Sequence, residues 1–401
     1  MLEKSGGGDL QPVGTVVAYD HDEPAVCSNF VARMPMAAGY DPFFVNYLHF
    51  TLYANRVNIR STKQTTGIQN LDGKAYLSEL VAFPPPAEQA AIVRFLDWAN
   101  GRLERAIRAK RKVIALLNEQ KQAIIHRAVT RGLDPSATLK PSGIPWLGDI
   151  PQHWEVRRLK SLSRFVTSGS RGWARYYADA GFVFLRIGNI STTSIDLRLK
   201  RITYVTPPDG AEGERTRAIP DDLLLSITAQ IGAVGVVPKG LGEAFVNQHT
   251  ALIRLRQGDS VPRWVAYGLL SSFGKDQCRL MTNGGTKVGL TLDDVRCLVV
   301  LLPPLEEQAA IVAGIERQTS DLDSAISRLE SEIELLREYR TRLVADVVTG
   351  KLDVREALSA CDAQVGAARL PEEAGGSDES DLSDESDLSD GVGESFPEEG
   401  P

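Results

Sequence analysis

Residue types on which metal and redox chemistry depend are scarce or scattered in this 401-residue chain. Its four cysteines, Cys27, Cys278, Cys297 and Cys361, include no CxxC pair, which argues against a disulfide framework or a cysteine zinc site. The five histidines show no paired metal-ligand spacing. No apolar run reaches membrane-spanning length, and the first residues carry no signal-peptide core, so we expect a cytoplasmic protein.

Motifs of several enzyme classes are missing as well. No P-loop is present. An adenine methyltransferase would need an Asn/Asp-Pro-Pro-Tyr/Phe motif, which Thr206-Pro207-Pro208-Asp209 does not provide. The PD…(D/E)xK motif of nucleases is matched in part by Pro220-Asp221 and Lys239, but Val237 occupies the position of the second acid. We therefore expect a protein that catalyses no bond chemistry itself and holds no metal or cofactor.

Charge is divided unevenly along the chain. Residues 371–401 contain twelve Asp or Glu and no Lys or Arg, and the letters SDESDL occur there twice in tandem. This acidic, low-complexity composition predicts a disordered tail, which we assign to residues 359–401. Removing the twelve acids from the net charge of −7 leaves +5 for residues 1–370, a balance that permits a nucleic-acid partner without requiring one.

One segment of the chain is present twice. Residues 84–134 align without a gap to residues 303–353, at a constant offset of 219 and with 19 identities in 51 positions. Each copy opens on prolines followed by Glu88, or by Glu306 and Glu307, which suit the first turn of a helix. The repeat therefore predicts two long helices.

Apolar residues recur every seven positions in both predicted helices, as in a coiled coil. The predicted seam consists of Leu103, Ile107, Ile114, Leu117, Ile124, Leu322, Ile326, Leu329, Ile333, Leu336 and Leu343. Lys110, Lys121 and Arg340 interrupt this seam. Residues 102–131 carry a charge of +7 and residues 321–350 a charge of −3, so we expect an antiparallel pairing within the chain. The alternative is that each helix packs only on its own domain.

The regions before the two helices are also similar. Residues 42–47 match residues 262–267, and residues 14–17 match residues 235–237. The first region has 83 residues and the second has 161, and the difference corresponds to about residues 142–221. We therefore expect the first domain to begin in its middle.

The second region combines apolar runs with amphipathic patches, which predicts a mixed α/β (α+β) domain. Its strand candidates are residues 182–187, 223–227, 235–237, 251–255 and 297–301, and its helix candidates are residues 159–165 and 264–273. The predicted order is a partial first domain (1–83), a long helix (84–134), a second domain (135–302), a second long helix (303–358) and the acidic tail.

Together these features resemble the specificity (S) subunit of type I restriction-modification systems. The resemblance is carried by the PPxxEQxxI opening of each long helix and by the closing Val-Thr-x-x-Leu-Asp at 129–134 and 348–353. The segment GIPWLGDIPQHWEVRRLK at 143–160 and the alternation of domain and helix agree with it. The resemblance covers about residues 14–355, with the first half of the first target-recognition domain missing.

The resemblance implies that each domain before a helix is a target-recognition domain that reads one half of a bipartite site in double-stranded DNA. It implies that the paired helices hold the readers apart and carry methyltransferase subunits, for which we expect two, and a restriction and translocation subunit. S-adenosylmethionine, ATP and Mg²⁺ would belong to those partners. The alternative is a truncated or decayed S subunit that acts only as a partial DNA-binding or interaction scaffold.

The richest candidate for DNA contact is the glycine-punctuated stretch 167–177, which holds two arginines and three aromatic residues. Arginine can fork onto guanine or a phosphate, and small hydroxyl groups can contact either. The candidate contacts are Ser168, Ser170, Arg171, Trp173, Arg175 and Tyr176. The alternative is that the aromatic rings pack inward and the arginines are solvated.

Further candidates lie at predicted strand ends and in loops. They are Arg186, Asn189, Asn247, Gln248, His249, Asn283, Thr286 and Lys287, with Arg60 and Lys63 in the corresponding region of the first domain. Amide side chains suit adenine edges, and residues 282–287 combine backbone N–H groups with one cation that could hold a phosphate. The alternatives are an ion pair for Arg186, turn caps for residues 247–249 and an ordinary mobile loop for residues 282–287.

Overall fold

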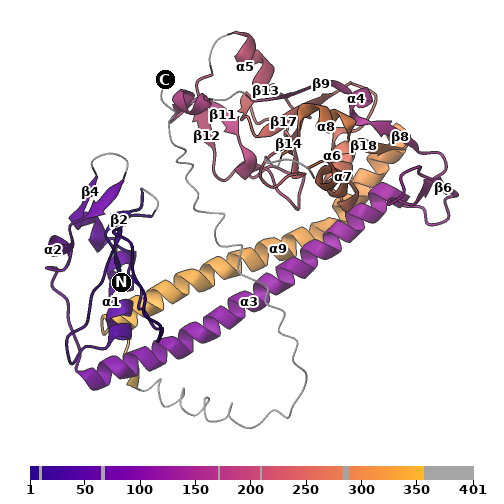
Figure 1. Cartoon of the computed structure of the whole chain (residues 1–401). Coiled ribbons are helices and arrows are strands. Elements are labelled where there is room, and N and C mark those ends of the chain that lie inside the picture. The colour runs from indigo at the N-terminus through magenta and orange to yellow at the C-terminus, as the bar shows by residue number, and fades with distance from the viewer. Residues whose placement is uncertain (9–10, 65–67, 170–171, 208–209, 283–288, 356–401) are drawn as a thin grey trace, which may run out of the picture. The chain divides into compact units, whose positions relative to one another are not determined.

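Two compact units make up the chain in the computed structural model (Figure 1), which describes residues 1–8, 11–64, 68–169, 172–207, 210–282 and 289–355. Unit 1 comprises Met1–Asn100 and Thr341–Pro401, and unit 2 comprises Gly101–Arg340. The predicted tail, residues 359–401, lies outside the described residues. None of the described helices is both long enough and apolar enough to cross a membrane.

Two long helices confirm the prediction made from the repeat. Helix α3 (Pro86–Arg131) has 46 residues and helix α9 (Leu305–Val348) has 44. Both begin beside the repeated prolines and carry glutamates in the first turn, where a carboxylate complements the helix dipole. Residues 101–131 of α3 and 305–340 of α9 belong to unit 2, and the rest of each helix belongs to unit 1.

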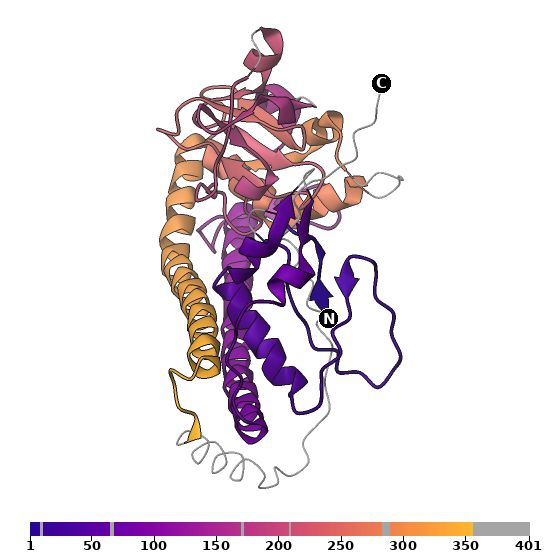
Figure 2. The same cartoon turned by 90° about the vertical axis from the view of Figure 1, so that its left-hand side faces the viewer.

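The parts of α3 and α9 that belong to unit 2 lie side by side and run in opposite directions (Figures 1 and 2). They are joined by three ion pairs, Glu104 with Arg340, Lys110 with Glu332, and Lys121 with Asp323. From the first pair to the last, the residue number rises from 104 to 121 on α3 and falls from 340 to 323 on α9. The predicted antiparallel pairing is therefore confirmed.

The predicted seam is buried or half-buried throughout its unit 2 part. Ile107 is 2% exposed and Ile333 is 6% exposed, and the other apolar seam residues of unit 2 are half-buried. The three charged residues that interrupt the heptads, Lys110, Lys121 and Arg340, each bind an acid on the opposite helix. The charge of each residue that interrupts the heptads is thus balanced by an acid on the opposite helix.

Two of these ion pairs are related by the sequence repeat. The offset of 219 carries Lys121 to Arg340 and Glu104 to Asp323. Lys121 binds Asp323 while Arg340 binds Glu104, so each copy makes the same contact with the other, as at the interface of a twofold-symmetric dimer. The helix pair is an internal interface with approximate twofold symmetry.

Short strands and helices form the rest of unit 2. The strands are β6 (Leu139–Pro141), β7 (Asp149–Pro151), β8 (Glu155–Arg158), β9 (Ser163–Ser168), β10 (Tyr177–Ala178), β11 (Phe182–Leu185), β12 (Thr203–Val205), β13 (Arg217–Ala218), β14 (Leu223–Ser226), β15 (Val234–Val236), β16 (Ala244–Val246), β17 (Thr250–Leu255) and β18 (Val299–Leu302). The helices are α4 (Leu159–Leu162), α5 (Ala211–Thr216), α6 (Pro262–Leu270), α7 (Ser272–Thr282) and α8 (Leu292–Cys297), with short 3-10 turns η2 (Trp173–Tyr176) and η3 (Ile187–Asn189).

Two sheets organise this domain and confirm the predicted mixed α/β class. One is four-stranded and antiparallel, in the order β15-β14-β17-β9. The other is five-stranded, in the order β10-β12-β11-β16-β13, and its β11 and β16 run parallel. The five predicted strands are present as β11, β14, β15, β17 and β18. The helix predicted at 159–165 ends at Leu162, because Ser163–Ser168 pair with β17 instead.

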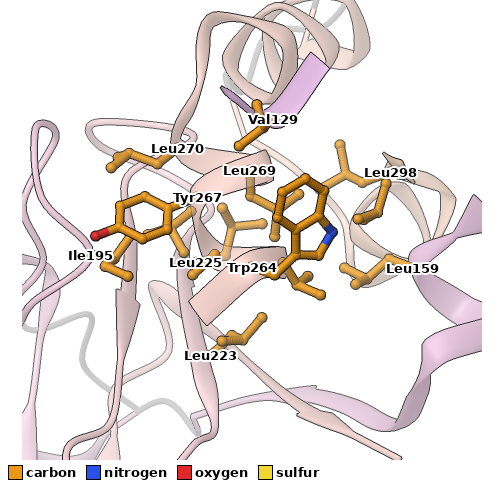
Figure 3. Close-up of a cluster of buried hydrophobic side chains, with 14 of the residues drawn as sticks. Val129, Leu159, Ile195, Leu223, Leu225, Trp264, Tyr267, Leu269, Leu270 and Leu298 are labelled. Atoms are coloured by element: carbon orange, nitrogen blue, oxygen red, sulfur yellow. The ribbon is translucent and has the colours of Figure 1, made fainter. Parts of the chain in front are cut away.

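The main core of unit 2 lies between the four-stranded sheet and helices α6 to α8 (Figure 3). Trp264 and Leu269 of α6 pack with Leu223 and Leu225 of β14, and all four are almost fully buried. The indole N–H of Trp264 donates to the carbonyl oxygen of Leu301 at 2.8 Å. The large aromatic ring thus adds apolar burial without leaving its polar group unpaired.

Unit 1 has shorter elements. They are β1 (Leu2–Glu3), β2 (Ser5–Gly6), β3 (Val31–Ala32), β4 (Thr62–Gln64), β5 (Gln69–Leu71), α1 (Pro42–Ala54), η1 (Val57–Ser61) and α2 (Gly73–Tyr76). Strand β1 pairs with β3, and β5 lies between β2 and β4. The core of this unit packs Phe44 and Leu48 of α1 against Leu96 of α3 and Val344 and Val347 of α9.

A buried glutamine makes the same contacts in both units. Gln308 donates to the carbonyl oxygen of Pro303 at 2.8 Å and accepts from the backbone N–H of Val261 at 2.8 Å. Gln89, at the same position of the repeat, donates to the carbonyl oxygen of Pro84 at 2.8 Å and accepts from the backbone N–H of Asp41 at 2.9 Å. Val261 and Asp41 are the residues that precede α6 and α1. Each glutamine therefore ties the start of a long helix to the start of a neighbouring one.

The strand registers show that the domains are duplicated too. In unit 2, Leu223 of β14 lies opposite Ile253 of β17, and in unit 1, Leu2 of β1 lies opposite Ala32 of β3. Both members of the pair are displaced by the same 221 positions. Leu2 also forms a bridge with Val16, as Leu223 pairs with Val236, so the similarity predicted for residues 14–17 and 235–237 reflects a shared strand arrangement.

Candidate nucleic-acid interface

Several chain segments with predicted DNA contacts meet at one edge of unit 2. The backbone N–H of Asn247 donates to the carbonyl oxygen of Leu185 at 3.1 Å, and that of Gly169 donates to the carbonyl oxygen of Asn247 at 3.2 Å. The C-terminal ends of β9, β11 and β16 therefore come together here. We call this region the loop edge. Its described members are Ser168, Gly169, Arg186, Thr228, Asn247, Gln248 and His249.

Gly169 makes this meeting possible. A Cβ atom at this position would lie 2.1 Å from the carbonyl oxygen of Val246 and 2.3 Å from the carbonyl carbon of Asn247. No larger residue fits, because both neighbours are backbone atoms that cannot move aside. The glycine is thus needed for a close approach of the protein's own strands.

The side chains of the 247–249 turn form a short hydrogen-bonded chain. Asn247 Oδ1 accepts from the Thr250 hydroxyl at 2.8 Å. His249 contacts Gln248 Nε2 through Nε2 at 2.9 Å and the Thr228 hydroxyl through Nδ1 at 3.1 Å. If Nε2 of His249 accepts from the amide, then Nδ1 carries the ring proton and donates to Thr228. Gln248 then keeps one amide hydrogen and its oxygen, which is the pair that a bidentate contact to adenine requires.

Arg186 follows β11 directly and is exposed. Asn189 supports the turn beneath it, since its Oδ1 accepts from the Arg186 backbone N–H at 3.0 Å. The Asn189 amide nitrogen donates to the carbonyl oxygens of Arg198 at 2.8 Å and Arg201 at 3.1 Å. Asn189 is 6% exposed and has used its hydrogen-bonding groups internally. It therefore positions Arg186 and is not part of the candidate surface.

The aromatic residues of the 172–177 stretch are divided between core and surface. Trp173 is 3% exposed and stacks on Phe184, with ring centroids 5.7 Å apart and an interplanar angle of 16°. Its side chain is thereby withdrawn from any ligand, as in the inward-packing alternative. Tyr176 is half-buried, and the exposed Arg175 lies over its ring at 5.8 Å. Arg175 Nε also donates to the carbonyl oxygen of Gly172 at 3.1 Å.

Five predicted contacts lie outside the described residues. They are Ser170, Arg171, Asn283, Thr286 and Lys287. The described residue before the first gap, Gly169, lies in the loop edge. After the second gap, the backbone N–H of Leu290 donates to the carbonyl oxygen of Ile227 at 2.8 Å, and that of Ile227 donates to the carbonyl oxygen of His249 at 3.1 Å. The chain therefore lies at this edge just before the first gap and just after the second.

The unit 1 candidates are placed differently. Arg60 is exposed in η1, and Lys63 of β4 forms a 2.8 Å ion pair with Asp72. The hydrogen bond from Lys63 holds the pKa of the Asp72 carboxyl below its ordinary value. An ion pair this exposed contributes little to stability and leaves the ammonium group accessible.

One member of the loop edge was not predicted. Thr228 fixes the His249 ring, and it lies in a turn with Gln230, whose φ is 50°. Left-handed backbone at a residue other than glycine has a local conformational cost. The sequence carries no local signal for this turn, because its importance comes from contact with a turn twenty residues further on.

Within the described ranges, no group of three His, Cys, Asp or Glu side chains is placed to hold a metal ion.

Unit 2 is a mixed α/β domain with a polar loop edge, and it contains an antiparallel pair of duplicated helices. Residues 151–335 match the family described as type I restriction modification DNA specificity domain. This match and the relatives below show that the chain is similar to specificity subunits of type I restriction-modification systems.

Two relatives illustrate the similarity. The putative type I restriction enzyme MjaX specificity subunit of Methanocaldococcus jannaschii is 24% identical over 343 residues, which cover 82% of this chain and 72% of the relative. The EcoBI specificity subunit of Escherichia coli is 21% identical over 361 residues, covering 86% and 74%. A chain from a structural study of complex assembly and conformational transition of the type I R-M system has a TM-score of 0.46 and 18% identity, covering 78% of this chain and 72% of its own length.

Proposed function

We propose that this chain is the DNA-sequence-specificity subunit of a type I restriction-modification complex, and that unit 2 reads one half of a bipartite target. The loop edge is the observation that carries the proposal. It collects a forked cation, an amide with free donor and acceptor groups, and a hydroxyl from three separate strand ends. The relatives of this chain, which are named as specificity subunits, support the same function.

The chemistry of the loop edge suits base recognition. Arg186 is exposed and held at its backbone by Asn189, so its guanidinium can fork onto guanine or a phosphate. Gln248 is fixed by His249 and offers the pairing pattern of an adenine edge. Ser168 supplies a small hydroxyl that contacts either a base or the backbone. A side chain that is fixed in the free protein, as that of Gln248 is, loses little freedom on binding.

The rest of the complex would supply the chemistry. In this proposal the helix pair is a scaffold for two methyltransferase subunits and for a restriction and translocation subunit. S-adenosylmethionine, ATP and Mg²⁺ belong to those partners, and this chain contributes no catalytic residue. The antiparallel helix pair supports the scaffold role, because the ion pairs Lys121–Asp323 and Arg340–Glu104 give its seam an approximate twofold symmetry.

Comparison of two arginine substitutions tests the reading of DNA. The target is first defined by mapping methylated adenines in the native genome and in a strain that lacks this gene. Binding of the assembled complex to a duplex with that motif is then measured for Arg186→Ala and for Arg158→Ala. Both arginines are exposed, but Arg158 lies beyond the opposite end of β9 from the loop edge.

We expect Arg186→Ala to reduce discrimination between target and mismatched duplexes by about 1–3 kcal/mol and Arg158→Ala to leave it unchanged. If Arg186 instead holds a phosphate, affinity falls equally for all duplexes and the salt dependence becomes weaker by about one charge. Equal binding by wild type and Arg186→Ala at several salt concentrations would refute the assigned site. Absence of any two-part methylation motif that depends on this gene would refute the function.

A further inference from the structure

A buried amide joins two chain segments beside the loop edge. Asn189 Oδ1 accepts from the backbone N–H of Arg186 at 3.0 Å, and the carbonyl oxygen of Asn189 accepts from the backbone N–H of Arg198 at 2.8 Å. The Asn189 amide nitrogen donates to the carbonyl oxygens of Arg198 at 2.8 Å and Arg201 at 3.1 Å. One side chain of unit 2 therefore holds the backbones of three arginines.

The second of these segments alternates apolar and cationic residues. Leu197 and Leu199 are half-buried and pack on the core cluster that contains Leu185, the residue before Arg186. Arg198 and Lys200 alternate with these leucines and are exposed, as is Arg201. Side chains that alternate in this way point to opposite sides of the chain. The inward packing of the leucines thus directs the cations to solvent.

The charge of this surface is not neutralised within the described parts of the chain. Residues 186–201 contain one acid, Asp196, and four cations, which are Arg186, Arg198, Lys200 and Arg201. Asp196 is bound by Arg263 at 3.0 Å. Among the described residues, none of the four cationic side chains forms an ion pair, and that of Arg198 donates to the buried hydroxyl of Ser191 at 3.4 Å. We call Arg198, Lys200 and Arg201 the cationic cluster.

The chemistry of the cationic cluster suits the backbone of a nucleic acid. A guanidinium group can bind a phosphate through two N–H donors, and an ammonium group binds it as a compact charge. Protein–DNA interfaces are strongly positive, whereas lysine is depleted in protein–protein interfaces. Arg186 belongs to the loop edge, and Asn189 ties the cluster to Arg186. A duplex at the loop edge would therefore bring its backbone to the cluster.

We propose that the cationic cluster holds phosphates of the duplex whose bases the loop edge reads. Phosphate contacts fix the register and the orientation of a protein on DNA and carry no sequence information directly. Asn189 is then a positioning residue, because it joins these contacts to Arg186. The inference rests on the proposed function, since it requires that unit 2 binds DNA.

The salt dependence of DNA binding tests this assignment. The variant carries Arg198→Gln, Lys200→Gln and Arg201→Gln together. The assembled complex is titrated with two duplexes of equal length, one with the mapped target motif and one with that motif scrambled, at several salt concentrations. Each phosphate contact contributes about 0.9 to the slope of log K against log salt concentration, so the slope should become shallower by about two to three on both duplexes. Affinity should fall by the same factor for both, which leaves their discrimination unchanged.

The matched control carries Arg158→Gln, Lys160→Gln and Arg164→Gln. It removes two guanidinium groups and one ammonium group from exposed residues, in and before the end of β9 that is opposite to the loop edge. Both variants have the same net charge, so a difference between them reports a local contact. The control should keep the slope of the wild type, and neither variant should change Tm, because all six residues are exposed.

Three results would overturn the assignment. They are equal slopes for the cluster variant and the control, a change in discrimination between the two duplexes, which would make the cluster a base reader, and weaker assembly of the complex with an unchanged slope, which would assign the cluster to a partner subunit. The scrambled duplex separates this inference from the proposed function. If the wild type does not prefer the target duplex, the proposed function fails, whereas the slopes on the scrambled duplex still decide whether the cluster binds phosphate.

Discussion

The ammonium group of Lys121 lies 2.5 Å from a carboxylate oxygen of Asp323, across the seam between α3 and α9. The Lys121 side chain is 6% exposed, while that of Asp323 is 50% exposed. A lysine at a heptad core position weakens packing, yet it specifies which partner and which register the helix accepts. The repeat places Arg340 opposite Glu104 in the same way, so each of the two helices carries a cation that specifies the partner and the register.

This asymmetry in burial predicts unequal effects of the two single substitutions. Asp323→Ala leaves a buried ammonium group without its partner and should lower the free energy of unfolding by about 1–3 kcal/mol. Lys121→Leu removes the buried charge and restores an apolar heptad position, so stability should be unchanged or higher. Urea unfolding measures both. Asp321→Ala, an exposed acid two residues away, is the control and should have no effect; a Lys121→Leu variant less stable than Asp323→Ala would contradict the argument.

The repeated glutamines predict a matched pair of local defects. Gln308→Leu keeps the side-chain volume but leaves the Val261 N–H and the Pro303 carbonyl without partners. The cost should be about 1–3 kcal/mol, with faster hydrogen exchange at the start of α6. Gln89→Leu should have the same cost and should affect the start of α1. The exposed Gln318→Leu is the control, and equal stability of all three variants would show that water replaces both contacts.

The buried carboxylate of Asp222 in unit 2 is paired with the guanidinium of Arg254. Arg254 forks onto Asp222 with contacts of 2.8 and 2.6 Å, and Asp222 is 1% exposed. Arg254→Met should destabilise the protein by about 3–5 kcal/mol, because it leaves a carboxylate buried and unpaired. Burial already raises the pKa of Asp222, and the folded state then binds a proton more tightly than the unfolded state.

The damage in Arg254→Met should therefore shrink as the pH falls, since the protonated acid needs no counter-charge. Thermal unfolding at several pH values measures this. Arg164→Met, an exposed arginine on β9, provides the control. A loss of stability in Arg254→Met that does not change with pH would mean that lost packing on Phe165, which lies 4.7 Å below the guanidinium, is the main cause.

Local sequence was sufficient for the long helices and their pairing. The heptad spacing, the opposite charges and the repeated Pro-Pro-x-x-Glu-Gln opening all lie within short windows. The strands β14, β15 and β17 could likewise be predicted, because they are continuous apolar runs in a buried sheet. Each of these elements is determined mainly by its own residues.

Other elements depend on partners distant in the sequence. Strand β8 reads Glu-Val-Arg-Arg and is exposed along its length, so only its pairing with β18 makes it a strand. Strand β9 was predicted to continue a helix, and its pairing with β17 overrides that preference. Trp173 and Asn189 carry residue types that suit DNA contact, but pattern alone does not separate an inward side chain from an outward one. The loop edge could be predicted only in part for the same reason.

Acidification should destabilise unit 1 through His49. His49 Nδ1 lies 3.0 Å from the hydroxyl of Tyr76, and burial raises the pKa of Tyr76 to about 12, so the phenol stays neutral and can donate to the ring. Burial, and then the amino terminus, lower the pKa of His49 from its ordinary value of 6.5. The unfolded state then binds more protons than the folded state, so the stabilising effect is complete above about pH 6.5 and is lost as the pH falls through the folded pKa.

The expected slope is at most about 1.4 kcal/mol per pH unit, the limit for one proton. It is measured as the change in hydrogen exchange of α1 between pH 5 and 8. His49→Gln keeps a partner for Tyr76 and should remove the slope, whereas His21→Gln, an exposed histidine in the same unit, should retain it. If both variants keep the slope, another group binds the proton, and burial of His49 does not control the stability of this unit in acid.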